Sequence, residues 1–243
     1  MKMIKEIVDN LPSEGYAVFD FDNTCIINDI QEALLAYLCE NSILKNFNGE
    51  EVFKKYYQLI ESSKLHEAYE FAVSVFWGFS LDELRKFTKD SIDSEGSRIT
   101  KRELFGIKIN KGIKRNESIY KLMKLMYIKG YKIYIVSTSS KYVVEWAFKR
   151  FFSNISANVI GIENIIKNRI LTDELVYPLS VYGGKVENIK NKISGNEKPI
   201  LAVGDSIGDE KMLEYSQVKI VVDRNNQLTK IAKDKGWIVL LQR

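Results

Sequence analysis

Two aspartates, Asp20 and Asp22, stand directly after a short apolar run at residues 16–19 that is typical of a buried strand. Thr24 follows them in a segment whose composition indicates a turn. Two carboxylates this close repel each other unless one holds a proton or a cation lies between them. A hard divalent cation with oxygen ligands meets that requirement, so the sequence predicts metal-assisted chemistry at the end of this strand.

Three later polar clusters follow apolar runs or glycines in the same way: Ser137 with Thr138, Lys185, and Asp205 with Asp209. Because the carboxyl ends of parallel strands meet at one edge of a sheet, these clusters can converge on the first one. Together they supply a nucleophilic carboxylate, an acid/base carboxylate, hydroxyl donors, a lysine and carboxylates for a cation. This set suits phosphoryl transfer, in which positioning and charge neutralisation dominate and an aspartate can form a covalent intermediate.

Each later cluster also has a purely structural interpretation. Ser137 and Thr138 could cap the following helix, and Asp205 and Asp209 could be turn and N-cap residues. Lys185 could be a solvated helix residue, because the surrounding residues do not complete a P-loop. The agreement of all the clusters with one chemistry favours the catalytic interpretation.

The elements that must position these residues follow from the pattern of the whole chain. Strand-like runs alternate with helical patterns at both ends, which predicts a doubly wound α/β core with a parallel, Rossmann-like sheet. The middle of the chain has no proline and no strong strand pattern, so it predicts an all-helical cap inserted after the first strand. The predicted divisions are a core of residues 1–27 and 113–243 and a cap of residues 28–112.

Two local features are also predicted. Asn28 is expected to cap the first cap helix, residues 28–39, with Gln31 completing a capping box. Asn168 and Arg169 interrupt an apolar stretch at residues 165–171 and indicate a small hairpin.

The composition excludes several classes of function. The net charge of +4 is small beside 36 basic and 32 acidic residues, and the lysines are spread along the chain, so no nucleic acid partner is expected. Two cysteines and one histidine provide neither a disulfide framework nor a histidine-rich metal site. Neither a signal peptide nor a membrane-spanning run is evident, so no membrane partner and a cytoplasmic location are expected.

Four motifs together resemble the haloacid dehalogenase superfamily, in the branch of phosphoserine-phosphatase-like and phosphorylcholine-phosphatase-like hydrolases with a helical C1-type cap. The motifs are FDFDNT, IYIVSTSS, GGKVENI and AVGDSIGDE. Their order and spacing agree with the family over nearly the whole chain. The family's last motif usually reads Gly-Asp-Gly-x-Asn-Asp in phosphoserine phosphatases, whereas Ser206 and Gly208 stand in two of those positions here. This departure weakens the case for phosphoserine as the substrate.

The resemblance implies roles for the matching residues. Asp20 would be the nucleophile, and Asp22 would protonate the leaving oxygen and then activate water. Ser137 would hold a phosphoryl oxygen, and Lys185 would neutralise charge on Asp20 and the phosphoryl group.

The same resemblance implies a Mg²⁺ site formed by Asp20, the backbone carbonyl of Asp22, and Asp205. Asp209 would support that site, either as a ligand through water or as a partner of Lys185, and Thr24 would support it from the first motif.

The substrate is expected to be a small phosphorylated amine such as phosphocholine, phosphoethanolamine or phosphoserine. Asp29 stands where phosphoserine phosphatases place an acid that meets the substrate's ammonium group, although it could equally favour the start of a helix. Thr138 is a further candidate for substrate binding, with Ser137 and Lys185. Two alternatives remain: a phosphotransferase using the same intermediate, and a catalytically inactive binding protein of the same fold.

Overall fold

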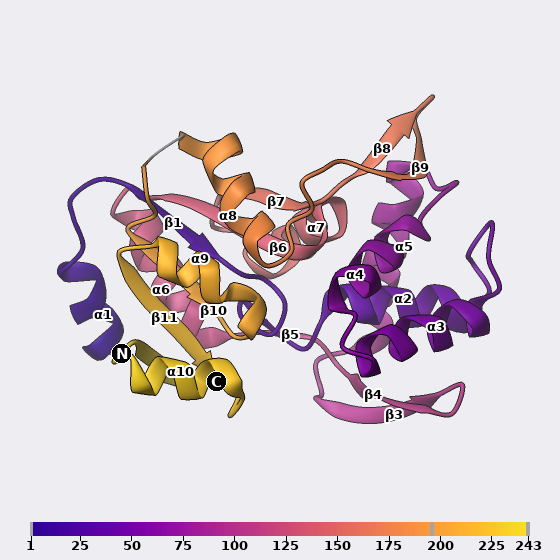
Figure 1. Ribbon diagram of the computed structural model, residues 1–243, viewed down its shortest axis with the longest axis horizontal. Helices are drawn as coiled ribbons and strands as arrows, with labels where there is room; N and C mark the ends of the chain where they lie inside the picture. The colour runs from indigo at the N-terminus through magenta and orange to yellow at the C-terminus, as the bar shows by residue number, and fades with distance from the viewer. Residues whose placement is uncertain (1, 195–196, 242–243) are drawn as a thin grey trace.

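The computed structural model describes residues 2–194 and 197–241, and its core is a six-stranded parallel sheet (Figure 1). The strands lie in the order β12 (Ile238–Leu241), β11 (Val218–Asp223), β10 (Leu201–Gly204), β1 (Tyr16–Phe19), β6 (Lys132–Ser140) and β7 (Asn158–Ile162). The order reverses at β1, where the chain departs in both directions. The predicted doubly wound α/β core is therefore confirmed.

Helices cover both faces of this sheet. One face carries α1 (Lys2–Asp9), α6 (Glu117–Ile128) and α7 (Lys141–Phe151), and the other carries α8 (Gly183–Ile189), α9 (Glu210–Tyr215) and α10 (Gln227–Asp234). Within β1, Ala17 and Phe19 pack into the first layer while Tyr16 and Val18 pack into the second. Every residue of β1 is buried, which explains why its sequence is a continuous apolar run rather than an alternating one.

The cap lies beside the core in Figure 1 and begins after a short ribbon in which β2 (Ile26–Ile27) pairs with β5 (Lys114–Arg115). It contains the helices α2 (Ile30–Glu40), α3 (Gly49–Glu61), α4 (Leu65–Ser74) and α5 (Leu81–Glu95). The expectation that the cap is entirely helical is wrong. A hairpin of β3 (Thr100–Leu104) and β4 (Ile107–Lys111) follows α5.

This cap hairpin has a weak sequence pattern because most of its residues are polar and exposed. Leu104 and Ile109 are its buried side chains. The turn at Phe105 and Gly106 has positive φ at both residues, 49° and 80°, which is the geometry of the tight hairpin turns that match strand twist.

The start of α2 also differs from the prediction. The N-cap is Asp29, whose carboxylate accepts a hydrogen bond from the backbone N–H of Glu32 at 2.9 Å. Asn28 instead adopts a left-handed conformation with φ of 69°, and its side-chain amide donates to the carbonyl of Gly112 at 2.8 Å. Asn28 therefore joins the two chain segments that connect the core to the cap.

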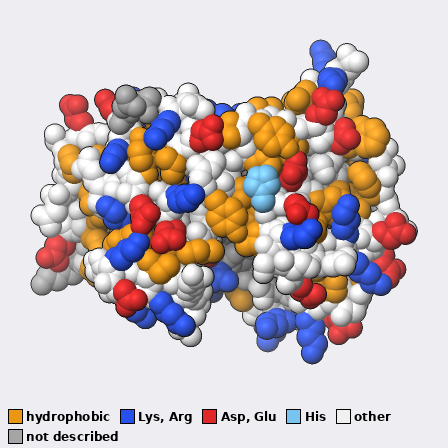
Figure 2. All heavy atoms as spheres, viewed as in Figure 1, with side chains coloured by type: hydrophobic (Ala, Val, Ile, Leu, Met, Phe, Trp, Pro, Cys, Tyr) orange, Lys and Arg blue, Asp and Glu red, His pale blue; other side chains and the backbone are white. Residues whose placement is uncertain are grey.

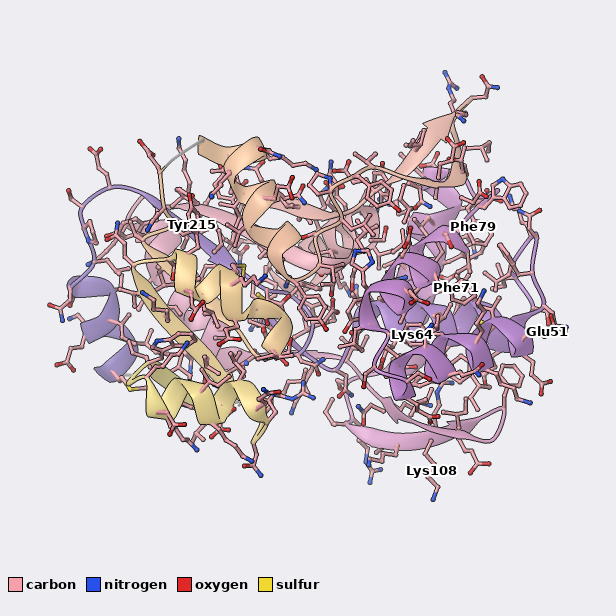
Figure 3. All side chains as sticks on the ribbon, viewed as in Figure 1. Glu51, Lys64, Phe71, Phe79, Lys108 and Tyr215 are labelled. Atoms are coloured by element: carbon pink, nitrogen blue, oxygen red, sulfur yellow. The ribbon has the colours of Figure 1, made fainter. Side chains whose placement is uncertain are left out.

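A second hairpin, β8 (Asn164–Lys167) and β9 (Ile170–Leu175), confirms the one predicted around Asn168 and Arg169. It extends from the core to the cap, where Phe71 and Phe79 are labelled in Figure 3. The backbone of Leu171 receives a hydrogen bond from Gly78 N–H at 2.9 Å and donates one to the carbonyl of Phe79 at 2.8 Å. We call β8–β9 the bridging hairpin, because it is hydrogen-bonded to a part of the cap that is distant in sequence.

The α5 helix of the cap also rests on α7 of the core. The guanidinium of Arg85 lies 3.9 Å from the ring centroid of Trp146, and Arg150 pairs with Asp93 at 3.2 Å. The cap is thus held at its chain crossings, at the bridging hairpin and along α5.

Basic and acidic side chains lie interspersed on the face of the molecule that Figure 2 shows. Among residues 2–194 and 197–241, no helix combines the length and the apolar character that crossing a membrane requires.

The bridging hairpin provides a test of how the cap is held. Asn164 is buried, and its side-chain amide donates to the carbonyls of Val73 in the cap and Thr172 in the hairpin, at 3.0 and 2.9 Å. We expect Asn164→Ala to lower the free energy of unfolding by about 1–3 kcal/mol, because a buried carbonyl and a partly buried one lose their donor. Urea unfolding followed by circular dichroism measures this change.

The control is Lys167→Ala, which removes an exposed ion pair with Glu174 in the same hairpin. It should change the free energy of unfolding by less than about 1 kcal/mol. Equal midpoints for Asn164→Ala and the wild type would show that this contact does not hold the cap.

Candidate active site

The sequence clusters meet at the carboxyl edge of the sheet because β10, β1 and β6 are neighbours in it. Asp20 follows β1, Asp205 follows β10, and Ser137 lies near the end of β6. A cavity of about 140 Å³ opens at this edge, between the core and the cap. Its core side includes Asp20, Asp22, Thr138, Lys185 and Asp205.

Lys185 lies at the centre of the site and is 2% exposed. Its ammonium group contacts Oδ1 of Asp20 at 2.7 Å and Oδ1 of Asp209 at 2.6 Å. Burial opposes the charge of Lys185, but the two carboxylates outweigh it and raise the pKa of this lysine above its usual value. Lys185 therefore remains charged and neutralises the nucleophile candidate, which excludes the solvated-lysine interpretation.

Asp209 has a partner for each of its carboxylate oxygens. Besides the contact of Oδ1 with Lys185, its Oδ2 accepts hydrogen bonds from the backbone N–H groups of Asp205 and Ser206, both at 3.1 Å. Gly204 makes room for this side chain, because a Cβ at that position would lie 2.5 Å from the Cβ of Asp209. In this structure Asp209 is the partner of Lys185 and orients the loop that carries Asp205.

Asp22 is enclosed by donors that fix its orientation. Its Oδ1 accepts from the backbone N–H of Ile30 at 2.7 Å, and its Oδ2 accepts from the hydroxyls of Ser139 at 2.7 Å and Ser137 at 3.3 Å. Burial, and then the charge of Asp29, raise the pKa of Asp22 to about 8. A carboxylic acid that keeps its proton at neutral pH is suited to donate that proton to a leaving group.

The two hydroxyl residues near the end of β6, Ser137 and Thr138, occupy different positions in the structure. Thr138 lines the cavity, whereas Ser137 is fully buried against Asp22 and does not belong to the cavity lining. Ser139, which makes the shorter bond to Asp22, was not among the predicted site residues. The only available signal was its position in the polar cluster at the end of β6.

Asp205 is positioned from three directions. Its Oδ1 accepts from the Thr24 hydroxyl at 3.0 Å, its Oδ2 lies 3.6 Å from the guanidinium of Arg224, and its backbone carbonyl accepts from the Asn226 side chain at 2.8 Å. The supporting position predicted for Thr24 is thus beside a metal-ligand candidate. Arg224 and Asn226 escaped prediction because they follow β11, which carries none of the recognised motifs.

The carboxylates of Asp20, Asp205 and Asp209 form the group suited to a cation, with one oxygen from each lying within 4.8 Å of the others. All three are buried, and burial together with the neighbouring carboxylates raises the pKa of Asp20 to about 7 and that of Asp205 well above its usual value. Concentrated negative charge and oxygen donors fit a hard divalent cation. Because Lys185 and two N–H groups already engage Asp209, Asp20 and Asp205 fit the role of direct ligands better.

The cap side of the cavity is formed by Asp29 at the start of α2 and by Leu65 and Tyr69 of α4, whose N-cap, Lys64, is labelled in Figure 3. Burial, and then the charge of Glu32, raise the pKa of Asp29 to about 7. Asp29 caps α2, as its structural interpretation predicts, and it also lines the cavity. Its contact with an ammonium group of the substrate stays a prediction.

A family model described as haloacid dehalogenase-like hydrolase matches residues 17–214, which include all four motifs. The chain belongs to this family. The membership predicted from the sequence is confirmed, and with it the expectation of a hydrolase.

Two characterised relatives of this family member are named as phosphatases. It is 26% identical to the phosphorylcholine phosphatase of Pseudomonas aeruginosa, over 81% of this chain and 70% of that protein. It is 22% identical to the histidinol-phosphatase of Neisseria meningitidis serogroup C, over 93% of this chain and 98% of that protein.

Solved structures share the fold of this hydrolase. A protein of unknown function from Anaerococcus prevotii matches with a TM-score of 0.72 and 19% identity, over 98% of this chain and 90% of that one. A structure described as a phospho-aspartyl intermediate analogue of phosphoserine phosphatase matches with a TM-score of 0.59 and 19% identity, over 93% of each chain.

The ion cluster around Lys185 generates a prediction that needs no substrate. We expect Lys185→Met to lower the free energy of unfolding by about 3–5 kcal/mol, because it leaves Asp20 and Asp209 buried without their cation. Urea unfolding of the metal-free protein at neutral pH measures the loss.

Lys211→Met is the matched control, since Lys211 is exposed on the neighbouring helix α9. It should leave the free energy of unfolding within about 0.5 kcal/mol of the wild type. A Lys185→Met protein as stable as this control would contradict the central role assigned to the lysine.

Proposed function

We propose that this hydrolase is a Mg²⁺-dependent phosphomonoesterase that works through an aspartyl-phosphate intermediate and acts on a small phosphorylated amine. The observation that carries the proposal is the convergence of Asp20, Asp22, Lys185 and Asp205 on one cavity of about 140 Å³. The cavity is smaller than the roughly 300–1,000 Å³ typical of pockets for drug-sized ligands, which favours a small substrate.

In the first step, a carboxylate oxygen of Asp20 attacks phosphorus, and the bond from phosphorus to the leaving oxygen breaks. Asp22 transfers its proton to that oxygen, so the alcohol leaves in neutral form. The raised pKa of Asp22 supports this role, because the acid must be protonated when the substrate binds. Lys185 offsets negative charge beside Asp20 throughout the step.

In the second step, Asp22 accepts a proton from a water molecule, whose oxygen attacks phosphorus. The bond between phosphorus and Asp20 breaks, inorganic phosphate leaves, and both aspartates return to their starting states. The hydroxyls of Ser139 and Ser137 hold Oδ2 of Asp22, so the same carboxyl group stays oriented through both proton transfers. Thr138 lines the cavity and is the hydroxyl placed to contact a phosphoryl oxygen.

Asp20, Asp205 and the backbone carbonyl of Asp22 would hold Mg²⁺. When bound, the ion would neutralise charge on the phosphoryl oxygens and on the nucleophile. The carboxylates of Asp20 and Asp205 support this assignment, because burial and then the charges of neighbouring aspartates raise their pKa values, and a bound cation would stabilise their charged forms.

The substrate class rests on Asp29 and on the relatives. Asp29 places a carboxylate on the cap side of the cavity, where it can pair with an ammonium group. The names of the two relatives refer to phosphorylcholine and histidinol phosphate. Phosphocholine, phosphoethanolamine, phosphoserine and histidinol phosphate therefore form the panel of first choice.

The nucleophile assignment predicts that Asp20→Asn abolishes phosphate release from every compound in this panel, because the amide cannot form the phosphorylated intermediate. Asp22→Asn should lower turnover by about 10²–10⁴-fold through loss of the proton donor. Phosphate release with and without Mg²⁺ measures both effects. Asp82→Asn, an exposed aspartate of the cap, serves as the control and should retain full activity.

Undiminished release by Asp20→Asn would rule out the proposed intermediate. Adding an acceptor alcohol to the wild type separates hydrolysis from phosphotransfer, since a transferase would convert the alcohol into a new phosphate ester. Tight binding of a panel compound without any turnover would favour the inactive binding protein instead.

The metal assignment predicts that Asp205→Asn weakens Mg²⁺ binding by at least about tenfold, because a charged ligand becomes a neutral one. Isothermal titration of Mg²⁺ into the metal-free protein measures this change without any substrate. Asp209→Asn tests the division of roles and should alter stability more than Mg²⁺ affinity, because Asp209 is the partner of Lys185. If Asp209→Asn instead weakened Mg²⁺ binding more than it lowered stability, Asp209 would be a direct ligand.

A further inference from the structure

Two acidic side chains lie at the start of α2, Asp29 as its N-cap and Glu32 in its first turn. The charge of Arg224 acts on Glu32 from beyond ion-pair distance. Asp29 lines the cavity and accepts a backbone hydrogen bond, and Glu32 behind it accepts one from the hydroxyl of Tyr56 at 3.3 Å. Burial raises the pKa of both carboxyl groups. Within residues 2–194 and 197–241, no lysine, arginine or histidine forms an ion pair with either of them. A partly buried acidic pair of this kind is stabilised by a cation that arrives with a ligand.

The walls beside Asp29 are apolar and aromatic. Tyr69 comes from α4 of the cap, and Tyr182 comes from the loop that leads into α8 of the core. Both line the cavity, with Leu65, Val181 and Ile207 completing its apolar surface. A carboxylate combined with tyrosine rings is a chemistry that recognises an ammonium group, through charge and through the negative faces of the rings.

Among the described residues, the lining of the cavity supplies no second cation for another anionic group on the leaving alcohol. Of the described residues that line it, Lys185 is the only one with a positive charge, and it is already engaged by Asp20 and Asp209. Arg224 lies outside the lining and contacts Asp205. A carboxylate on the leaving alcohol would therefore face Asp29 without a compensating cation, an arrangement that costs binding energy.

On the basis of the proposed function, we infer that the pocket selects phosphate esters of amino alcohols that carry no carboxylate, with Asp29 and Tyr69 as the residues that determine this specificity. Phosphoethanolamine and phosphocholine belong to the selected class, and phosphoserine is excluded from it. Tyr69 and Asp29 act on the leaving group, whereas the residues around Lys185 act on the phosphoryl group.

Phosphoethanolamine and phosphoserine form a matched pair, because they differ only by the carboxylate. We expect kcat/KM to be higher for phosphoethanolamine by on the order of 100-fold, since like charges brought together at a binding site cost several kcal/mol. Glycerol phosphate, a phosphate ester of a neutral alcohol, provides the reference for the phosphoryl site alone.

Asp29→Ser removes the charge but keeps a residue that caps helices well, so α2 should still form. Because the charge of Asp29 also acts on Asp22, some loss is expected on every ester. The loss of kcat/KM should nevertheless be at least about tenfold larger for phosphoethanolamine than for glycerol phosphate, which has no ammonium group. Tyr69→Phe should retain activity on phosphocholine because the ring remains, whereas Tyr69→Leu should lose most of it.

The outcomes separate the two proposals. Phosphoserine hydrolysed as well as phosphoethanolamine, or equal losses on glycerol phosphate and phosphoethanolamine in Asp29→Ser, would overturn the specificity inference and leave the phosphatase assignment intact. Failure of the wild type to hydrolyse any of these esters, glycerol phosphate included, would overturn the proposed function and the inference together.

Discussion

The contact of Lys185 with Asp20 and Asp209 is the interaction on which the rest of the site depends. Three buried carboxylates, counting Asp205, gather around one buried ammonium group, and Arg224 at 3.6 Å is a more distant partner of Asp205. Such a cluster is tolerable only where its charges are paired, because burying an unpaired charge is costly. The lysine thus allows the ends of β1 and β10 and the start of α8 to come close together. Because three carboxylates outnumber one ammonium group, an excess of negative charge remains that a divalent cation can neutralise.

The cap is linked to the same site through Asp22, for which we propose the role of acid. The backbone N–H of Ile30, the first residue of α2, donates to Oδ1 of Asp22 at 2.7 Å. Asp29 directly precedes Ile30. The residue that we expect to contact the leaving group is therefore adjacent in sequence to the residue whose N–H binds Asp22. The residues proposed to donate the proton and to contact the leaving group are therefore positioned by the same segment of the chain, before α2 begins.

The sheet and the polar residues that meet at its carboxyl edge could be predicted from the sequence, because both leave strong local patterns. A strand buried on both faces, such as β1, is a continuous apolar run, and the polar residues at its end interrupt that run visibly. The β3–β4 hairpin left no such pattern because its residues are mostly exposed. Ser139, Arg224 and the bridging hairpin's contacts with the cap could not be predicted, since each depends on which distant segments the tertiary fold brings together. Asn28 was mistaken for an N-cap because its neighbour Asp29 competes for that role equally well on sequence alone.

The attachments of the cap explain how a small cavity can be selective. Connections at the chain crossing, at Leu171 of the bridging hairpin and between α5 and α7 hold the cap to the core in the structure. With the cap held in this way, Tyr69 and Asp29 lie at a defined place above the phosphoryl site, so the length and charge of the leaving group decide whether it fits. A cap that moved freely could accept many alcohols, because its side chains would adjust to each one. The selectivity that we propose for this hydrolase therefore depends on the contacts that hold the cap as well as on the residues that line the pocket.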